Sequence, residues 1–128
     1  MSTIRVLLVE DNEVYRSTLE LLLPGRGGIE IVGSIGDGGE AAEAAERLDP
    51  DVVLMDFRLP HLDGAQATAA VRARAPRAAI VCLTAEATLE EREAVIAAGA
   101  VGFVEKGRPT DELVAAIRSA NEQGASTA

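Results

Sequence analysis

The sequence predicts an α/β protein in which five short strands alternate with five helices, a (βα)5 architecture with one parallel sheet. Two observations lead to this prediction. The chain contains five short apolar runs with few polar residues inside them, which is typical of strands buried on both faces of a parallel sheet. Each run is followed by a segment with helical periodicity or with residues that begin a helix. Together they indicate a sheet that helices cover on both sides.

The expected strands cover residues 4–9, 29–32, 51–55, 80–83 and 101–104. The first helix begins at Asp11 or Asn12, since either side chain can accept a hydrogen bond from an amide of the first turn, and it stops at Pro24. The second helix follows a glycine-rich turn at 36–39 and ends near Pro50. This turn matches neither the dinucleotide fingerprint nor the phosphate-loop spacing, so we interpret it as a strand-to-helix connection.

The remaining three helices have equally clear starting residues. Asp63 caps the third helix, which continues to about residue 74. Thr88 and Glu91 have the spacing of a capping box at the start of the fourth helix, and Gly99 ends it. Pro109 opens the last helix, whose apolar residues fall on one face.

Length and composition fit one small domain with an aliphatic core. The chain has 128 residues, with no Trp, one Tyr and two Phe, and lies within the common range of domain sizes. We expect the domain to cover residues 1–122, and residues 123–128 to form a flexible tail or a truncated linker. The only cysteine, Cys82, lies inside an apolar run and is expected to be buried, which fits a reducing cytoplasm.

The charge balance excludes some partners. A formal net charge of −9 argues against direct binding to nucleic acid or to an anionic membrane surface. No apolar stretch is long enough for a transmembrane helix, and the N-terminal run is too short for a signal peptide. We therefore expect a cytoplasmic protein that acts away from the membrane.

A polar side chain stands at the end of four of the five expected strands. Glu10 and Asp11 follow the first strand, Asp56 the third, Thr84 the fourth and Lys106 the fifth. In an open parallel sheet, ligands bind at the carboxyl ends of the strands, so these groups should converge on one site.

The set of groups suits a divalent cation and a phosphoryl group. Mg²⁺ prefers carboxylate oxygens, water and phosphate oxygens. A carboxylate can act as a nucleophile and form an acyl phosphate, and phosphoryl transfer mainly needs positioning and positive charge, which Mg²⁺ and Lys106 can supply. Because the set lacks a separate general base, hydrolysis of the product should be slow, which suits a signal better than a turnover enzyme.

Four motifs occur in a fixed order along the chain: Val9-Glu10-Asp11, Met55-Asp56 with Pro60 and Asp63-Gly64, Leu83-Thr84-Ala85, and Phe103-Val104-Glu105-Lys106. They closely resemble the receiver domain of bacterial two-component response regulators, over residues 4 to about 121. The resemblance implies a flavodoxin-like, doubly wound sheet with the strand order 2-1-3-4-5.

The resemblance also implies roles in phosphorylation. Asp56 would accept a phosphoryl group from a sensor histidine kinase or a phosphotransfer protein. Asp11 and Asp56, with Glu10 and the backbone carbonyl of Arg58, would bind Mg²⁺. Such a domain is not an enzyme in the usual sense, because only self-phosphorylation from small donors and slow autodephosphorylation are expected.

The same resemblance implies how the signal is read. Thr84, the backbone of Ala85 and Lys106 would bind the phosphoryl group. Thr84 and Phe103 would form a switch pair, in which the hydroxyl moves toward the phosphoryl group and the ring turns inward. Taken alone, Phe103 fits an ordinary core residue better, and the switch role rests on the resemblance.

One departure from the common receiver pattern points to a subgroup. Many receivers have proline directly after the lysine, often with a cis bond, whereas Gly107 follows here. This feature and residues 111–118 resemble receivers of the LuxR/FixJ type, which usually carry a C-terminal helix-turn-helix domain. The full-length output would then be transcription control, and a homodimer formed on phosphorylation or partner docking are further expected outputs. The chain is either a natural single-domain regulator or an excised receiver.

Several alternatives stay open at this level. Arg58 and Glu86 either form an ion pair at the mouth of the site and tune the phosphate lifetime, or are two solvated loop charges. His61 has no histidine partner and is expected to be exposed. A phosphatase or phosphotransferase with an aspartyl nucleophile is one rival, but such hydrolases usually have an acid where Arg58 stands. A receiver that works without phosphorylation is the other, and the intact acids argue against it.

Overall fold

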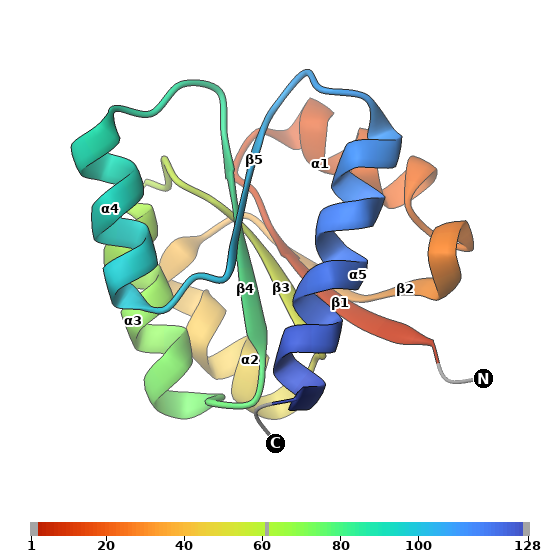
Figure 1. Cartoon of the computed structure of the whole chain (residues 1–128), viewed down its shortest axis with the longest axis horizontal. Coiled ribbons are helices and arrows are strands. Elements are labelled where there is room, and N and C mark those ends of the chain that lie inside the picture. Colours follow the sequence, from red (N-terminus) through yellow and green to blue (C-terminus); the bar gives the residue numbers. More distant parts are fainter. Residues whose placement is uncertain (1–2, 61, 127–128) are drawn as a thin grey trace.

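The computed structural model describes residues 3–60 and 62–126, and it contains one sheet of five strands (Figure 1). The strands are β1 (Ile4–Val9), β2 (Ile29–Ile35), β3 (Val52–Asp56), β4 (Ala79–Thr84) and β5 (Gly102–Glu105). All neighbouring strands are parallel, and their order in the sheet is β2-β1-β3-β4-β5. The predicted (βα)5 fold and its strand order are confirmed.

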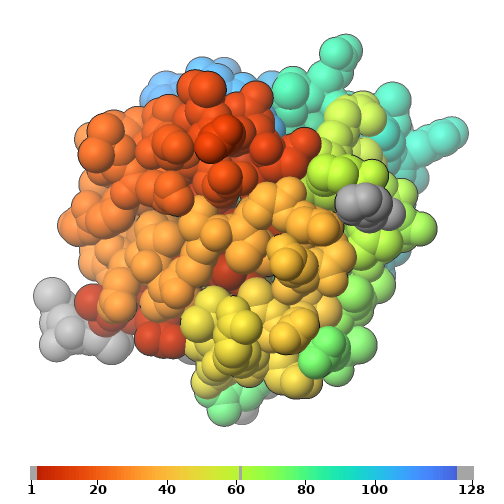
Figure 2. All heavy atoms as spheres, turned by 180° about the vertical axis from the view of Figure 1, so that it is seen from behind, coloured from red at the N-terminus to blue at the C-terminus, as the bar shows by residue number. Residues whose placement is uncertain are grey.

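Five helices, one after each strand, cover both faces of the sheet. They are α1 (Glu13–Leu22), α2 (Ala41–Leu48), α3 (Gly64–Arg74), α4 (Leu89–Ala98) and α5 (Thr110–Ser126). Helices α2, α3 and α4 lie on one face, and α1 and α5 lie on the other (Figure 1). Seen from behind, residues of β2 and α2, orange to yellow in Figure 2, lie across the middle of the molecule, below the red residues of α1.

Two aliphatic clusters, one on each face, hold the helices to the sheet. Alternate residues of the central strands supply both, because successive side chains of a strand point to opposite faces. On one face, Leu7 and Val53 pack with Ala44 and Val71 of α2 and α3. On the other, Leu8 packs in the cluster that includes buried residues of α1 and α5. Cys82 is buried in the cluster of Leu7 and Val53, as predicted, and burial raises the pKa of its thiol to about 12.

The predicted caps form. The Asn12 side chain accepts a hydrogen bond from the amide of Tyr15, so Asn12 is the cap of α1. Asp63 and Gln66 form a capping box at the start of α3. Thr88 and Glu91 form the predicted capping box of α4, and each such cap satisfies amides that the first helical turn leaves unpaired.

The element boundaries differ from the sequence prediction at a few points. Strand β2 continues to Ile35, because its pairing with β1 resumes after a register shift between Val6 and Leu7 and extends to Val9. Strand β5 covers Gly102–Glu105, one residue later than expected. The glycine-rich turn contains a short 3-10 turn, Gly38–Glu40, that Asp37 caps.

The C-terminal helix is longer than expected. Helix α5 continues to Ser126, past residue 122, and the assignment of residues 123–128 to a tail or linker stays a prediction. Residues 127–128 and His61 lie outside the described residues, so the expected exposure of His61 is not addressed. Every peptide bond of the described residues is trans. Among the described helices, none is long and apolar enough to cross a membrane.

Candidate functional site

The ends of four neighbouring strands bring the predicted polar groups together. Asp56 and Thr84 are the last residues of β3 and β4, and Glu10 and Lys106 directly follow β1 and β5. The amide of Lys106 donates a hydrogen bond to the carbonyl oxygen of Thr84 at 2.6 Å, which carries the chain from β5 back toward the site. The predicted convergence at one edge of the sheet is therefore observed.

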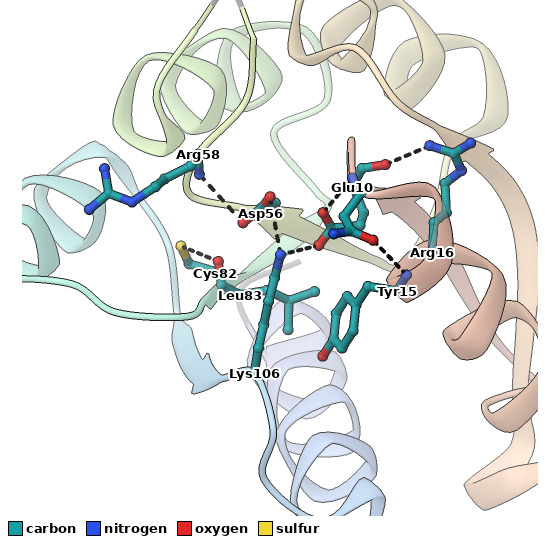
Figure 3. Close-up of polar contacts among 9 residues, drawn as sticks. Glu10, Tyr15, Arg16, Asp56, Arg58, Cys82, Leu83 and Lys106 are labelled. Atoms are coloured by element: carbon teal, nitrogen blue, oxygen red, sulfur yellow. Dashed lines mark hydrogen bonds and ion pairs between the residues drawn. The ribbon is translucent and has the colours of Figure 1, made fainter.

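The ammonium of Lys106 lies between two buried carboxylates (Figure 3). Its Nζ is 2.6 Å from Oε1 of Glu10 and 3.3 Å from Oδ2 of Asp56. Glu10 has no exposed surface and Asp56 is 4% exposed. The other oxygen of Glu10, Oε2, accepts a hydrogen bond from the amide of Asn12 at 2.9 Å. Buried charges need such partners, because removal from water is costly.

Three carboxylates meet at this point. One oxygen from each of Glu10, Asp11 and Asp56 lies within 4.8 Å of the others, and Asp11 alone is exposed to solvent. Burial, with the neighbouring charge of Glu10, raises the pKa of Asp56 to about 7. Burial alone would lower the pKa of Lys106, but its hydrogen bond to Glu10 and the charge of Asp56 together raise it. The cluster carries more negative charge than one lysine offsets, which is the condition that a divalent cation relieves.

The hydroxyl of Thr84 is buried at the site and could donate a hydrogen bond to an oxygen atom bound there. Thr84 is 1% exposed, and among the described residues its Oγ1 has no hydrogen-bond partner. A buried hydroxyl without a partner is costly. Thr84 lies at the end of β4, beside β3, whose last residue is Asp56. A phosphoryl oxygen on Asp56 would supply the missing partner.

The site has the parts of a known family. A model of the response regulator receiver domain matches residues 6–118. This chain belongs to the response regulator receiver family. The receiver is 35% identical over 119 residues to the transcriptional regulatory protein LiaR of Bacillus subtilis, a match that covers 93% of this chain and 56% of LiaR. The receiver thus spans about half the length of the curated relatives it matches.

Solved structures agree with the family and the subgroup. A two-component response regulator of the LuxR family from Aurantimonas sp. superposes with a TM-score of 0.89 at 33% identity, covering 95% of this receiver and 87% of that chain. The receiver domain of the sensor histidine kinase PA1611 from Pseudomonas aeruginosa, with a magnesium ion coordinated in its active-site cleft, superposes with a TM-score of 0.82 at 35% identity, covering 94% and 99%. The expected likeness to LuxR-type receivers is confirmed.

The ring of Phe103 lies outside the polar cluster of the receiver and contacts an arginine. Phe103 is half-buried in β5, and the guanidinium carbon of Arg92 lies 4.7 Å from its ring centroid. Arg92 also pairs with Glu105 at 3.1 Å. The aromatic ring is therefore held by a contact with α4, so the arrangement joins the predicted switch residue to that helix.

Arg58 reaches α4 through a partner that the sequence analysis did not name. Its amide lies 3.4 Å from Oδ1 of Asp56, and its guanidinium donates to the backbone carbonyl of Glu86 at 3.4 Å. An ion pair with the Glu86 carboxylate was one of two alternatives, and the guanidinium of Arg58 pairs instead with the carboxylate of Glu91, in the first turn of α4, at 3.5 Å. Ala85, expected to bind phosphoryl through its backbone, directly follows β4 and is exposed.

Two residues of α1 that contact the site, Arg16 and Tyr15, were not identified from the sequence. Arg16 donates to the backbone carbonyl of Glu10 at 2.8 Å. The Tyr15 ring lies next to Lys106, whose Nζ is 4.9 Å from the ring centroid. Their position in the sequence could have indicated this, because the first turn of a helix that directly follows a strand lies beside a site at the carboxyl end of that strand.

Proposed function

We propose that this receiver accepts a phosphoryl group on Asp56 from a sensor histidine kinase or a phosphotransfer protein. An oxygen of Asp56 forms a bond to phosphorus while the bond from phosphorus to the donor histidine nitrogen breaks, and the imidazole leaves with that electron pair. The observation that carries the proposal is the position of Asp56, which lies under the Lys106 ammonium and beside the unpartnered Thr84 hydroxyl. Both groups can neutralise or bind phosphoryl oxygens.

We propose that the reaction requires Mg²⁺. Asp11 and Asp56 would hold the ion, with Glu10 and the backbone carbonyl of Arg58 completing the protein ligands. The three clustered carboxylates and the raised pKa of Asp56 support this assignment, since they show an excess of negative charge at the site. When bound, Mg²⁺ supplies positive charge to the phosphoryl oxygens.

We propose that phosphorylation shifts the receiver between two conformations through Thr84 and Phe103. Among the described residues the Thr84 hydroxyl has no hydrogen-bond partner, and the guanidinium of Arg92 lies over the Phe103 ring. A phosphoryl group would draw the hydroxyl toward it, and the ring could then leave Arg92 and turn inward. The phosphoryl group shifts this equilibrium only by its differential contacts with the two states.

We propose a cytoplasmic role in signalling, with transcription control as the output of the full-length protein. A regulator of the LuxR family is among the solved relatives, and LiaR is a transcriptional regulatory protein. A homodimer formed on phosphorylation is one route to such an output. The receiver itself would not bind nucleic acid, because its net charge of −9 opposes binding to phosphates.

Intact-mass measurement after incubation with acetyl phosphate and Mg²⁺ tests the phosphoacceptor role. We expect the parent protein to gain one phosphoryl group and Asp56→Asn to gain none. Asp111→Asn is the matched control, since its side chain is 93% exposed at the start of α5, and it should be phosphorylated like the parent. Equal phosphorylation of Asp56→Asn would contradict the assignment of the acceptor.

A further inference from the structure

Tyr15 lies next to the phosphorylation site and is not part of the set of acids, hydroxyl and ammonium described so far. The Asn12 side chain accepts a hydrogen bond from the Tyr15 amide at 2.9 Å, which fixes the first turn of α1. The ring is half-buried, and the Nζ atom of Lys106 lies 4.9 Å from its centroid. The hydroxyl is turned away from Glu10 and Asp56 (Figure 3).

This ring gives the Lys106 ammonium a third contact besides its two carboxylates. A cation within about 6 Å of an aromatic centroid is attracted by the electrons of the ring face, and the attraction grows when the pair is shielded from water. The Lys106 side chain is only 18% exposed, so the contact is largely shielded.

The ring differs from the two carboxylates in one respect. When a phosphoryl group is added to Asp56, its oxygens compete with Glu10 and Asp56 for the ammonium. An uncharged ring face does not compete, and it can keep the ammonium in place while the anionic partner changes. This contact is therefore compatible with both the unphosphorylated and the phosphorylated site.

We propose that Tyr15 is a positioning residue that holds the ammonium of Lys106 over Asp56 through its ring face. The consequence for binding of a phosphoryl group rests on the function proposed above. Tyr15 also packs against the buried cluster that includes Leu19 and Leu83, so a test has to separate packing from the attraction between ring and ammonium.

The composition makes two selective experiments available. Tyr15 is the only tyrosine and Lys106 the only lysine of the chain. Lysine labelled with ¹³C at its ε-carbon therefore reports on Lys106 alone, and fluorotyrosine incorporated during expression changes Tyr15 alone. Fluorine weakens the negative potential of the ring face while altering its shape very little.

The first experiment records the ε-CH₂ signal of Lys106 in the metal-free, unphosphorylated protein. We expect the same ring-shifted signal in the parent and in Tyr15→Phe, and loss of that shift in Tyr15→Leu. Val14→Ala, in the same turn but 78% exposed, should leave the signal unchanged. An identical signal in the parent and in Tyr15→Leu would overturn the proposal, provided that thermal denaturation shows both proteins to be folded.

The second experiment measures the affinity for beryllofluoride, a phosphoryl analogue, with Mg²⁺ present. Loss of the ring in Tyr15→Leu should weaken binding about three- to tenfold, whereas Tyr15→Phe should bind within about twofold of the parent. Fluorotyrosine, used at a pH where the phenol is protonated, should give an intermediate affinity. Full affinity in Tyr15→Leu, or equal losses in the Phe and Leu variants, would overturn the proposal.

The two experiments also separate this proposal from the proposed function. If the parent binds no beryllofluoride and gains no phosphoryl group, the phosphoacceptor function fails. The ε-CH₂ signal of Lys106 still decides whether the Tyr15 ring holds the ammonium in that case.

Discussion

The three clustered carboxylates should make the metal-free receiver less stable than its fold allows, and Asp56→Asn should relieve this. Burial and the charge of Glu10 raise the pKa of Asp56 from 3.8 to about 7. Because the folded-state pKa lies above that of the unfolded chain, the folded protein binds the extra proton between these values. The free energy of unfolding should therefore fall as pH rises from about 4 to about 7, and stay level above that range.

The size of the effect follows from the pKa. A change from 3.8 to about 7 corresponds to roughly 4 kcal/mol of lost stability above pH 7. Solvent at the open edge of the sheet and salt screen part of this, so we expect about 2 kcal/mol. This loss of stability is a net value, because the raised pKa of Asp56 already contains the opposing attraction to Lys106, an attraction that Asp56→Asn also removes.

Urea denaturation in the presence of a chelator at pH 8 and at pH 5 measures this effect. At pH 8, Asp56→Asn should be more stable than the parent by about 2 kcal/mol, and the gain should be clearly smaller at pH 5. Asp111→Asn removes the same charge at an exposed position and should change stability by less than about 0.5 kcal/mol at either pH. An Asp56→Asn protein that is less stable than the parent at pH 8 would refute the reasoning.

Mg²⁺ should stabilise the parent more than the variant, because the ion binds the folded state of the parent better.

Three further substitutions test the site and its connection to α4. Thr84→Val should leave the stability of the metal-free protein unchanged or raise it by up to about 1 kcal/mol, because the lost hydroxyl has no partner among the described residues. The same substitution should weaken beryllofluoride binding about fivefold or more. A loss of stability without a loss of affinity would contradict this role. Arg92→Ala removes the contact with the Phe103 ring and the ion pair with Glu105. If those contacts belong to the unphosphorylated state, the variant should bind beryllofluoride about two- to fivefold more tightly. Calorimetry measures this affinity, and a weaker affinity would count against the switch. Arg58→Ala should speed dephosphorylation about two- to fivefold by opening the mouth of the site; an unchanged decay rate of the phosphorylated protein would show that Arg58 does not tune it.

The fold and the main site could be predicted from the sequence because both follow from local patterns. Apolar runs define strands that are buried on both faces, and a parallel arrangement sends all their carboxyl ends to one edge. A polar residue that ends such a run must then lie at that edge, which is why Glu10, Asp56, Thr84 and Lys106 meet as expected. Capping residues such as Thr88 are equally local and were predicted correctly.

The contacts of long side chains could not be predicted in the same way. Arg58 and Glu86 each stand two residues beyond a site residue, but side-chain reach and the position of α4 decide the actual partner, which is Glu91. Tyr15 and Lys106 are far apart in the sequence, and only the fold, which brings the first turn of α1 and the residue after β5 to the same edge of the sheet, places the ring next to the ammonium. Several strands also end one or more residues away from the positions expected from the sequence, because the pairing with neighbouring strands decides where each strand ends.

The central claim is that the phosphoryl group is carried by the carboxylate of Asp56, and borohydride reduction tests it most directly. An acyl phosphate is reduced to the alcohol, which converts the acceptor aspartate into homoserine. The receiver would be phosphorylated with acetyl phosphate and Mg²⁺, reduced, digested and mapped by mass spectrometry. The account predicts homoserine at position 56 and at no other aspartate. Homoserine at another position, or a phosphorylated protein that yields none, would contradict it.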